Sequence, residues 1–378
     1  MRRHPPVSIP RNLEAFAVDP DAVQVAWRGL PAGPIEFSCA DTSVTAEGDG
    51  GPGAVTLNGL PHSSALTVRV VPSGGDAREL DITTLAPPPG ERLTRFATMS
   101  DLHLGSTKFG MILKAREETG AAIPHPMRCA LAAGTEAQQW GAERLVLKGD
   151  LTHHTRAEEW PQLEELVGGF KVPYSFTLGN HDRQPKKKGI DTEKGMANAG
   201  LDFRPVTSVD LPGIRIVVAD TSIPNKGHGR TTEIIDEVCE LLRETDQPVF
   251  LGIHHHFEQF VLPWFWPPGI PVTEGVQFLR AIREANPRLM VSTGHTHRNR
   301  AYFRKGVLVT EVASPKDFPG VWGGYTVHEG GITQTVRRVA EPSAIAWTDR
   351  TRKAVGGIWS MWAPGYLDQR CFSHHWTD

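Results

Sequence analysis

Five short segments of this chain carry Asp, Asn and His residues where apolar stretches end. They read SDLHLG at 100–105, KGDLTHH at 148–154, LGNHD at 178–182, GIHHHF at 252–257 and TGHTH at 293–297. Oxygen and imidazole nitrogen atoms of these residue types hold transition metal ions in proteins. Two such ions, about 3.5–4 Å apart, can clamp a phosphoryl group and activate water. One segment alone is weak evidence, but the five together predict a two-metal hydrolytic centre.

The spacing within the segments fits this chemistry. Asp101 and His103 are separated by one residue after the apolar stretch RFATMS, and His295 and His297 repeat that spacing. In extended backbone, residues i and i+2 point to the same side, so Asp101 and His103 can both face one cation. Asp150 follows LVLKG, where the glycine allows a sharp turn. Its carboxylate has two oxygens and can bridge two metals.

The elements that must position these residues alternate along the chain. Apolar runs predict strands at 95–99, 144–147, 174–178, 213–219, 248–253 and 289–292. Helical patterns lie at about 127–141, 157–168, 231–244 and 275–285. Each metal-ligand segment comes just after one of the strands, and sites in α/β sheets form at the carboxyl ends of strands. We therefore predict an α/β layered domain with the site at that edge.

Residues 1–88 have a different pattern, rich in Gly, Pro, Ser and Thr. Apolar side chains alternate with polar or small ones at Val23, Val25 and Trp27 and again at Leu66, Val68 and Val70. This period of two predicts a small all-β sandwich, and the order of its segments loosely resembles a fibronectin type III module. The segment APPPGE at 86–91 reads as a short stiff linker.

The substrate loops and the C-terminal region are less informative. We expect substrate specificity to depend on loops 104–126, 183–210, 222–232 and 257–272, because loops carry function on a fixed scaffold. The first is long enough to form a lid. The aromatic segment FVLPWFWPP at 260–268 is expected either to pack against the core or to cover the mouth of the site. Residues 341–378 are expected to form an extension packed on the catalytic domain.

Composition excludes several classes of protein. The formal net charge of −3 shows no basic excess, so no nucleic-acid polymer is expected as a partner. The four cysteines form no CxxC pair, which favours a reduced, cytoplasmic protein. The start MRRHPPVSIPRN has no apolar run behind it, so we expect no signal peptide. No apolar stretch is long enough for a membrane span, and nothing indicates the oligomeric state.

Taken together, the five segments resemble the pattern D-x-H, G-D, G-N-H-D, H and G-H-x-H of the calcineurin-like metallophosphoesterase superfamily. The resemblance covers about residues 95–335. It implies a four-layer α/β/β/α sandwich, which we place at 93–340, and a dinuclear metal centre. By this resemblance, Asp101, His103 and His297 hold the first metal together with Asp150.

The same resemblance implies that Asn180, His254 and His295 hold the second metal, with Asp150 shared. The family commonly has H-H-P-P after the fifth strand, whereas this chain has HHHF at 254–257. His255 therefore remains an alternative to His254. The mixed shell of His, Asp and Asn favours Mn²⁺, Fe or Zn²⁺ over Mg²⁺.

His181 is implied to be the histidine beside the leaving group, a catalytic residue and not a ligand. It would be oriented by neighbours such as Asp182 and would donate a proton after attack by metal-activated hydroxide. The family usually has an acid three residues after G-D, where this chain has His153. We interpret His153 and His154 as surface residues.

The segment VVADTSIPNKGHG at 217–229 is loosely similar to a loop of the branch that contains cyclic-nucleotide phosphodiesterases and glycerophosphodiesterases. A small phosphodiester is therefore the expected substrate. A second hypothesis is a phosphomonoesterase like the purple acid phosphatases, but no tyrosine stands beside the G-D segment to serve as their iron ligand. Two further hypotheses are a nucleotide-sugar or lipid pyrophosphatase and, more remotely, a non-catalytic scaffold.

Overall fold

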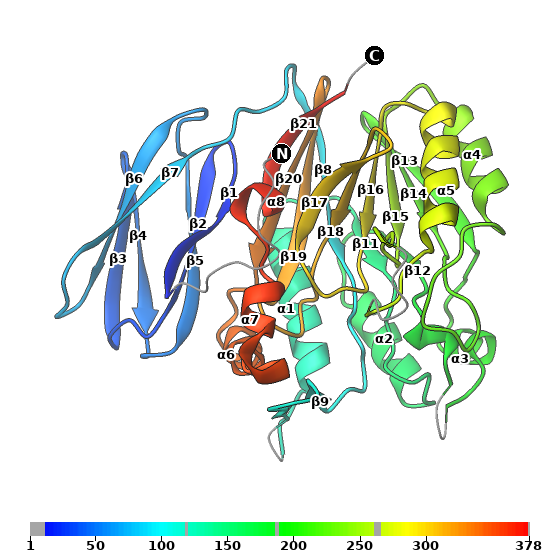
Figure 1. Cartoon of the computed structure of the whole chain (residues 1–378). Coiled ribbons are helices and arrows are strands. Elements are labelled where there is room, and N and C mark those ends of the chain that lie inside the picture. Colours follow the sequence, from blue (N-terminus) through cyan, green and yellow to red (C-terminus); the bar gives the residue numbers. More distant parts are fainter. Residues whose placement is uncertain (1–11, 118–119, 186–188, 261–265, 377–378) are drawn as a thin grey trace.

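The computed structural model describes residues 12–117, 120–185, 189–260 and 266–376. Its first part consists of strands and lies to one side of the molecule (Figure 1). These strands are β1 (Leu13–Val18), β2 (Ala22–Arg28), β3 (Gly33–Cys39), β4 (Thr42–Gly48), β5 (Pro52–Asn58), β6 (Ala65–Pro72) and β7 (Arg78–Thr83). They form a three-stranded sheet, β1-β2-β5, and a four-stranded sheet, β4-β3-β6-β7.

The alternation seen in the sequence of β2 predicts one buried face, but almost the whole strand is buried. Val23, Val25 and Trp27 face the core of the N-terminal strands. Gln24 is buried on the other side, where its amide donates a hydrogen bond to the carbonyl of Arg338 at 2.8 Å. The second face of β2 is therefore covered by the rest of the molecule instead of by water.

The first large sheet has the order β12-β11-β8-β19-β20-β21. Strands β8 (Arg92–Met99), β11 (Leu145–Lys148) and β12 (Tyr174–Thr177) run parallel. Strands β19 (Val321–His328), β20 (Gly331–Arg338) and β21 (Cys371–His375) continue the sheet in antiparallel pairs. The C-terminal region thus provides an edge strand of this sheet and is more than a layer packed on it. Strand β21 forms hydrogen bonds with β20, whose outer edge would otherwise present unpaired backbone groups.

The second large sheet has the order β13-β14-β15-β16-β18-β17. It contains β13 (Val206–Leu211), β14 (Ile214–Ala219), β15 (Val249–Ile253), β16 (Leu289–Thr293), β17 (Arg300–Arg304) and β18 (Val307–Glu311). Strands β14, β15, β16 and β18 are parallel, and the two edge strands are antiparallel to their neighbours. The central strands are fully buried, as expected for strands covered on both faces.

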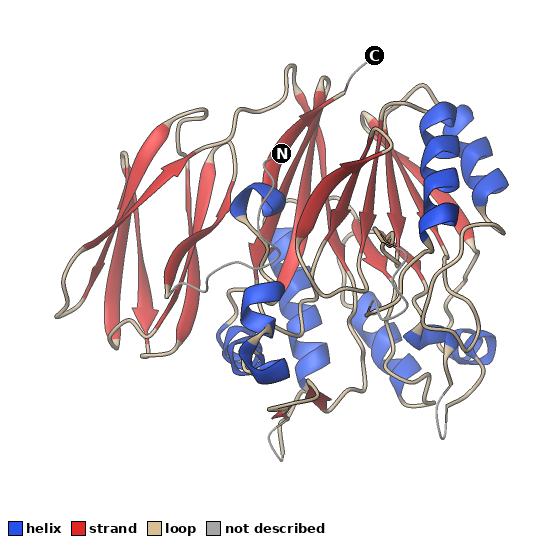
Figure 2. Cartoon of the chain, in the orientation of Figure 1, coloured by secondary structure: helices blue, strands red, loops and turns tan. Residues whose placement is uncertain are grey.

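Three clusters of apolar side chains hold these layers together. Phe96 and Val146 of the first sheet meet Phe250 and Met290 of the second in a cluster between the sheets. The helices α1 (His125–Gln139) and α2 (Glu159–Gly168) cover the other face of the first sheet. The helices α4 (Ile235–Arg243) and α5 (Val272–Ala285) cover the outer face of the second (Figure 2).

In the described part of the chain, the remaining elements are two short strands, two 3₁₀ helices and four α-helices. They are β9 (Lys108–Phe109), β10 (Ala115–Arg116), η1 (His181–Arg183), α3 (Thr192–Asn198), α6 (Pro342–Thr351), η2 (Ala354–Gly357), α7 (Trp359–Trp362) and α8 (Leu367–Arg370). No helix among the described residues is long and apolar enough to cross a membrane. Each of the four cysteines is buried and free.

The N-terminal strands contact the first large sheet through polar as well as apolar groups. The carboxylate of Asp19 accepts hydrogen bonds from Thr335 and Arg337, both on β20. Arg370 donates to the backbone carbonyl of Phe16 at 2.9 Å. Asp19 and these partners are buried, and a buried charge that loses its partner is strongly destabilising. The two parts are therefore held in one arrangement.

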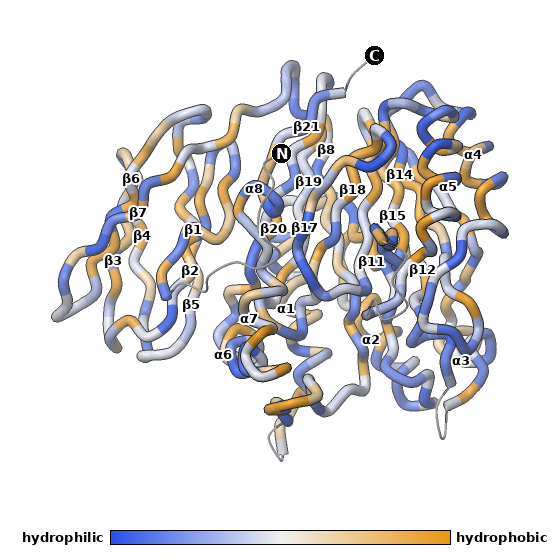
Figure 3. The backbone as a smooth tube through the Cα atoms, in the orientation of Figure 1, coloured by the Kyte–Doolittle hydropathy of each residue, from blue (hydrophilic) through white to orange (hydrophobic). Residues whose placement is uncertain are grey.

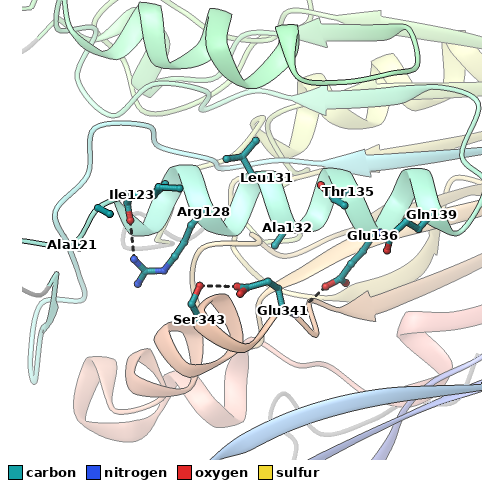
Figure 4. Close-up of a pocket in the computed structure, with 11 residues that line it drawn as sticks. Ala121, Ile123, Arg128, Leu131, Ala132, Thr135, Glu136, Gln139, Glu341 and Ser343 are labelled. Carbon is teal, nitrogen blue, oxygen red and sulfur yellow. Dashed lines mark hydrogen bonds between the residues drawn. The ribbon is translucent and has the colours of Figure 1, made fainter. Parts of the chain in front are cut away.

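A groove of about 710 Å³ lies between α1 and α6, and Glu136 forms part of its wall (Figure 4). The Glu136 carboxylate accepts hydrogen bonds from the backbone N–H of Ala340 at 2.8 Å and from the indole of Trp322 at 3.3 Å. Burial raises the pKa of this carboxyl from 4.5 to about 7, against the effect of these hydrogen bonds.

The raised pKa of Glu136 predicts a pH dependence of stability. The folded protein binds this proton more tightly than the unfolded chain does. The stabilisation is therefore complete below pH 4.5 and is lost as the pH rises through about 7. We expect a loss of up to about 3 kcal/mol, at 1.36 kcal/mol per pKa unit. Urea unfolding of the wild type and of Glu136→Gln at pH 5 and pH 7.5 measures this loss. Between these two pH values the free energy of unfolding should fall more in the wild type than in the variant. Parallel losses in both proteins would contradict the assignment.

Candidate metal centre

The five segments meet at the carboxyl ends of strands from both large sheets. The first sheet supplies Asp101 and His103 after β8, Asp150 after β11 and Asn180 after β12. The second sheet supplies His254 after β15 and His295 and His297 after β16. The backbone N–H of His295 donates to the Asp101 carboxylate at 3.0 Å and so joins the two groups. The sequence order of the motifs does not indicate this division between sheets.

Glycines allow the loops to approach one another closely. A side chain at Gly179 would place its Cβ 2.3 Å from Oδ1 of Asp150 and 2.8 Å from Nε2 of His254. Gly149 has φ of +81°, which allows the sharp turn before Asp150. Any larger residue at position 179 would therefore displace the groups that the site brings together.

Five of the seven expected ligands have left-handed backbone conformations. Their φ values range from 47° to 67°, and the residues are Asp101, His103, Asp150, His295 and His297. Residues other than glycine rarely adopt this conformation, and each instance costs on the order of 1–3 kcal/mol. Such strain persists only where the surrounding structure enforces it. Its concentration in these loops marks them as a functional site.

The first group of ligand atoms includes the imidazole nitrogens of His103 and His297. Their Nε2 atoms lie 3.3 Å apart. Oδ1 of Asp101 lies 3.4 Å from Nε2 of His297, and Oδ2 of Asp150 lies 3.5 Å from Nε2 of His103. Two nitrogens and two carboxylate oxygens that converge in this way fit a cation between them.

The second group lies on the other side of Asp150. Oδ1 of Asp150 is 3.3 Å from Nε2 of His254, which is 3.2 Å from Nδ1 of His295. The side-chain oxygen of Asn180 is buried and has no hydrogen-bond partner. A buried oxygen of this kind is costly unless it binds something, and an amide oxygen is a suitable ligand for a metal ion. The residues present therefore fit a second cation, with Asp150 between the two positions.

Hydrogen bonds fix which ring nitrogens can bind a metal. Nδ1 of His254 donates to the carbonyl of Lys148 at 2.8 Å, and Nε2 of His295 donates to the carbonyl of Pro268 at 2.9 Å. In both residues the other ring nitrogen faces the centre, and it offers a lone pair to a metal when the ring is neutral. This arrangement of outer partners is typical of histidines that bind metals.

The structure also places His255 close to the second group. Its Nδ1 lies 2.8 Å from the hydroxyl of Thr221, and its Nε2 has no hydrogen-bond partner. Ligand atoms of His254, His255 and His295 lie within 4.8 Å of one another. His254 is the one that contacts the shared carboxylate of Asp150, and on this ground we favour it as the ligand.

The charges of the site depend on burial and on Asp150. Burial alone would lower the pKa of His254, but the carboxylates of Asp150 and Asp101 raise it to about 9. Burial and neighbouring cationic groups hold the pKa of His103 and of His295 well below the ordinary value. The imidazoles of His103 and His295 are thus neutral and able to bind metal, whereas a metal must displace a proton from His254.

Comparison with known proteins agrees with this geometry. The sequence profile described as "Calcineurin-like phosphoesterase" matches residues 94–299, which is more than half of the chain. The chain is a member of the calcineurin-like phosphoesterase family. The expected superfamily is thereby confirmed, and membership supports a hydrolase that acts on phosphoric esters.

Individual relatives of this phosphoesterase are distant. A protein from a Synechococcus species, named probable cyclic nucleotide phosphodiesterase, is 25% identical over 179 residues. The alignment spans 47% of this chain and 66% of the relative, slightly under two thirds of its length.

The structures it resembles are also remote. A purple acid phosphatase from yellow lupin is 14% identical, with a TM-score of 0.48 over 86% of this chain and 72% of the other. The structure titled PhoD is 13% identical, with a TM-score of 0.43 over 89% of both chains.

The structure of this phosphoesterase places His181 beside the first group of ligands. Its ring centroid lies 4.5 Å from that of His103, and its backbone N–H donates to Asp150 at 2.8 Å. Nδ1 of His181 donates to the carbonyl of His153 at 2.8 Å. The carboxylate of Asp182 accepts bonds from backbone N–H groups, such as that of Thr152 at 2.7 Å. The His153 carbonyl, and not Asp182, therefore orients His181.

The sequence predicts that His153 lies on the surface, but it is half-buried against the site. Its Nδ1 lies 3.4 Å from Nδ1 of His103. When His103 binds metal through Nε2, its Nδ1 carries the proton and donates it to His153. A histidine thus takes the position beside His103 where the family pattern has an acid. The position of His153 three residues after the G-D segment is the one sequence feature that points to the site. It does not show whether the side chain faces the ligands or the solvent.

Sequence reasoning missed Asp317 altogether. Its Oδ2 accepts a hydrogen bond from Nδ1 of His297 at 2.7 Å, and its Oδ1 accepts one from the indole of Trp359 at 3.2 Å. Burial would lower the pKa of His297, but Asp317 and Asp101 raise it. Asp317 lies in a loop after β18, with no motif or periodicity to mark it.

Asp317→Asn is expected to weaken metal binding by about 10- to 100-fold, the usual effect of losing an outer partner of a histidine ligand. Competition with a chromophoric chelator measures the affinity directly. Asp349→Asn is the matched control, because Asp349 pairs with Arg28 away from the site. Equal metal affinity of Asp317→Asn and the control would show that Asp317 does not support the ligand.

The aromatic segment at 260–268 is partly described. Residues 261–265 lie outside the described residues, and Trp266 is exposed. The carbonyl of Pro268 reaches His295, so the end of this loop contacts the site.

Proposed function

We propose that this chain is a phosphodiesterase that uses two metal ions. The observation that carries the proposal is the convergence of two ligand groups on one carboxylate. Asp150 lies between the pair His103 and His297 and the pair His254 and His295. The unpartnered oxygen of Asn180 adds a donor to the second group. A structural cluster would instead satisfy these polar groups among themselves.

The proposed ligands of the first ion are Asp101, His103, His297 and Asp150. Those of the second are Asn180, His254, His295 and Asp150. Bound metals supply activation of water and neutralisation of phosphoryl charge. We propose Mn²⁺, Fe or Zn²⁺, because imidazole nitrogen makes up much of the shell.

The chain itself positions the groups around the reacting phosphoryl. Because Nδ1 of His181 donates to the His153 carbonyl, the proton that can be given to the leaving group is one on Nε2. General acids of this kind typically contribute about 10²–10⁴-fold to the rate. His181 is thus the proposed catalytic acid.

Two features support a diester over a monoester. The relative whose sequence aligns is named as a cyclic nucleotide phosphodiesterase. No tyrosine stands beside the G-D segment at 149–150 to take the place of the tyrosine ligand of purple acid phosphatases. Tyr325 is buried between the sheets, where it contacts Ser292 at 3.1 Å, and Tyr174 packs against Phe170 and Phe176.

The test is a panel of substrates with the Mn²⁺-loaded protein. Bis(p-nitrophenyl) phosphate, cyclic nucleotides, glycerophosphodiesters, nucleotide-sugar pyrophosphates and p-nitrophenyl phosphate are compared at equal concentration. We expect the highest kcat/KM on a diester, with loss of activity on chelation and recovery on adding metal. Preference for the monoester would favour a phosphomonoesterase, and preference for the pyrophosphates a pyrophosphatase. A folded protein that binds no metal would overturn the proposal.

We also propose an architecture for the whole chain. The arrangement of two large sheets between two groups of helices supports a four-layer α/β/β/α catalytic domain. The seven N-terminal strands in two sheets support a module of the fibronectin type III kind. Limited proteolysis, which cleaves preferentially in exposed linkers, should cut near 86–91 if the module is a separate domain.

A further inference from the structure

Two segments far apart in the sequence lie side by side at one edge of the site. One is the hairpin of β9 and β10, and the other contains η2 and α7. The backbone N–H of Val355 donates to the carbonyl of Ile112 at 3.0 Å. The rings of Phe109 and Trp359 are in edge contact, with centroids 5.2 Å apart. We call this surface, made of residues 108–116 and 353–362, the lip.

The lip exposes an unusual number of large apolar side chains. Met111, Ile112 and Leu113 are 64%, 61% and 63% exposed at the tip of the hairpin. Ile358 is 55% exposed and Met361 37% on the neighbouring segment. In Figure 3 an orange stretch lies at the position that Figure 1 labels β9. Isolated exposed apolar residues are normal, but a contiguous group of this kind marks a site of interaction.

The charges of the lip have one sign. Lys108, Lys114, Arg116 and Lys353 are exposed around the apolar tip. The sequence has no Asp or Glu between 105 and 116 or between 350 and 367. The lip is therefore positively charged, whereas the chain as a whole has a formal charge of −3.

The lip is connected directly to the metal centre. The rings of Phe109 and Trp359 lie 6.0 and 6.1 Å from that of His297. The indole of Trp359 also donates to Asp317, the partner of His297. The inner side of the lip therefore packs against a residue of the first ligand group.

We propose that the lip docks this phosphoesterase on an anionic lipid surface. Met111, Ile112 and Leu113 project from a hairpin tip and suit insertion among acyl chains. The ring of Lys and Arg side chains suits the negative headgroups, which attract basic residues near a membrane. Apolar insertion combined with basic contacts is the usual composition of peripheral membrane sites. Docking does not depend on the reaction proposed for the centre, although it would bring headgroup phosphates close to it.

Vesicle sedimentation of the full chain tests the proposal. The wild type is expected to bind phosphatidylcholine vesicles that contain phosphatidylglycerol, and to bind pure phosphatidylcholine much more weakly. The variant Met111→Ser/Ile112→Ser/Leu113→Ser should bind the vesicles at least about tenfold more weakly. Transfer of one large apolar side chain from water into an apolar environment already changes a binding constant by about this factor. Lys108→Gln/Lys114→Gln/Lys353→Gln should weaken binding to anionic vesicles and reduce its dependence on salt.

The matched control is Phe303→Ser, which removes an apolar side chain that is 55% exposed on β17, outside the lip. It should bind vesicles as the wild type does, and circular dichroism checks that each variant is folded. Equal binding of the triple Ser variant and the control would overturn the proposal. Sedimentation equilibrium tests whether a second copy of the chain occupies the lip instead. If the wild type formed a dimer and bound no vesicles, and the triple Ser variant were a monomer, the lip would be assigned to a second copy of the chain.

Discussion

Asp150→Asn is expected to lower kcat on the preferred diester by at least about 10²–10³-fold and to reduce metal content at both positions. Asp150 contacts His103 on one side and His254 on the other. Replacement of one carboxylate oxygen by an amide NH₂ removes a negative donor from the point that the two positions share. The loss of an electrostatic group that acts on the transition state commonly has this magnitude. Metal content by mass spectrometry and steady-state kinetics with Mn²⁺ measure both effects.

The control is Asp210→Asn, because Asp210 is a surface carboxylate paired with Arg215 far from the ligands. It should keep two metals per chain and wild-type turnover. If Asp150→Asn also kept both, Asp150 could not be the bridging ligand, and the dinuclear proposal would lose its central residue.

His181→Ala is expected to separate turnover from metal binding. Metal content should remain near that of the wild type, because Nδ1 of His181 donates to the His153 carbonyl and His181 is not one of the seven proposed ligands. On a diester with an alkoxide leaving group, kcat should fall by about 10²–10⁴-fold. On bis(p-nitrophenyl) phosphate the loss should be much smaller, because p-nitrophenolate leaves without a proton.

His62→Ala serves as the control, since His62 is an exposed residue in the turn between β5 and β6 of the N-terminal part. Its kinetics should match the wild type on both substrates. Loss of metal from His181→Ala would make His181 a ligand, and an equal loss of rate on both leaving groups would remove its role as the acid.

Much of the catalytic domain could be predicted from the sequence, because its strands are short apolar runs and its ligands follow them directly. The expected strands at 248–253 and 289–292 appear as β15 and β16, and the expected helix at 127–141 appears as α1. His295 and His297 fall next to their partners because strand ends gather at one edge of the molecule.

The remaining features depend on contacts between distant segments. The division of the strands between two sheets is decided by the cluster around Phe96 and Phe250, which no local pattern reveals. Asp317 acts through one hydrogen bond to His297, and a single acid in a loop carries no periodic signal. The strand β21 forms because β20 offers it a free edge, and its polar sequence, CFSHH, does not resemble a buried strand.

The left-handed backbone of the ligands has a consequence for how this centre can be lost. Glycine adopts that conformation without the steric penalty that Asp and His incur. At Asp101, His103, Asp150, His295 and His297, a mutation to glycine would therefore remove a metal donor and relax the fold at the same time.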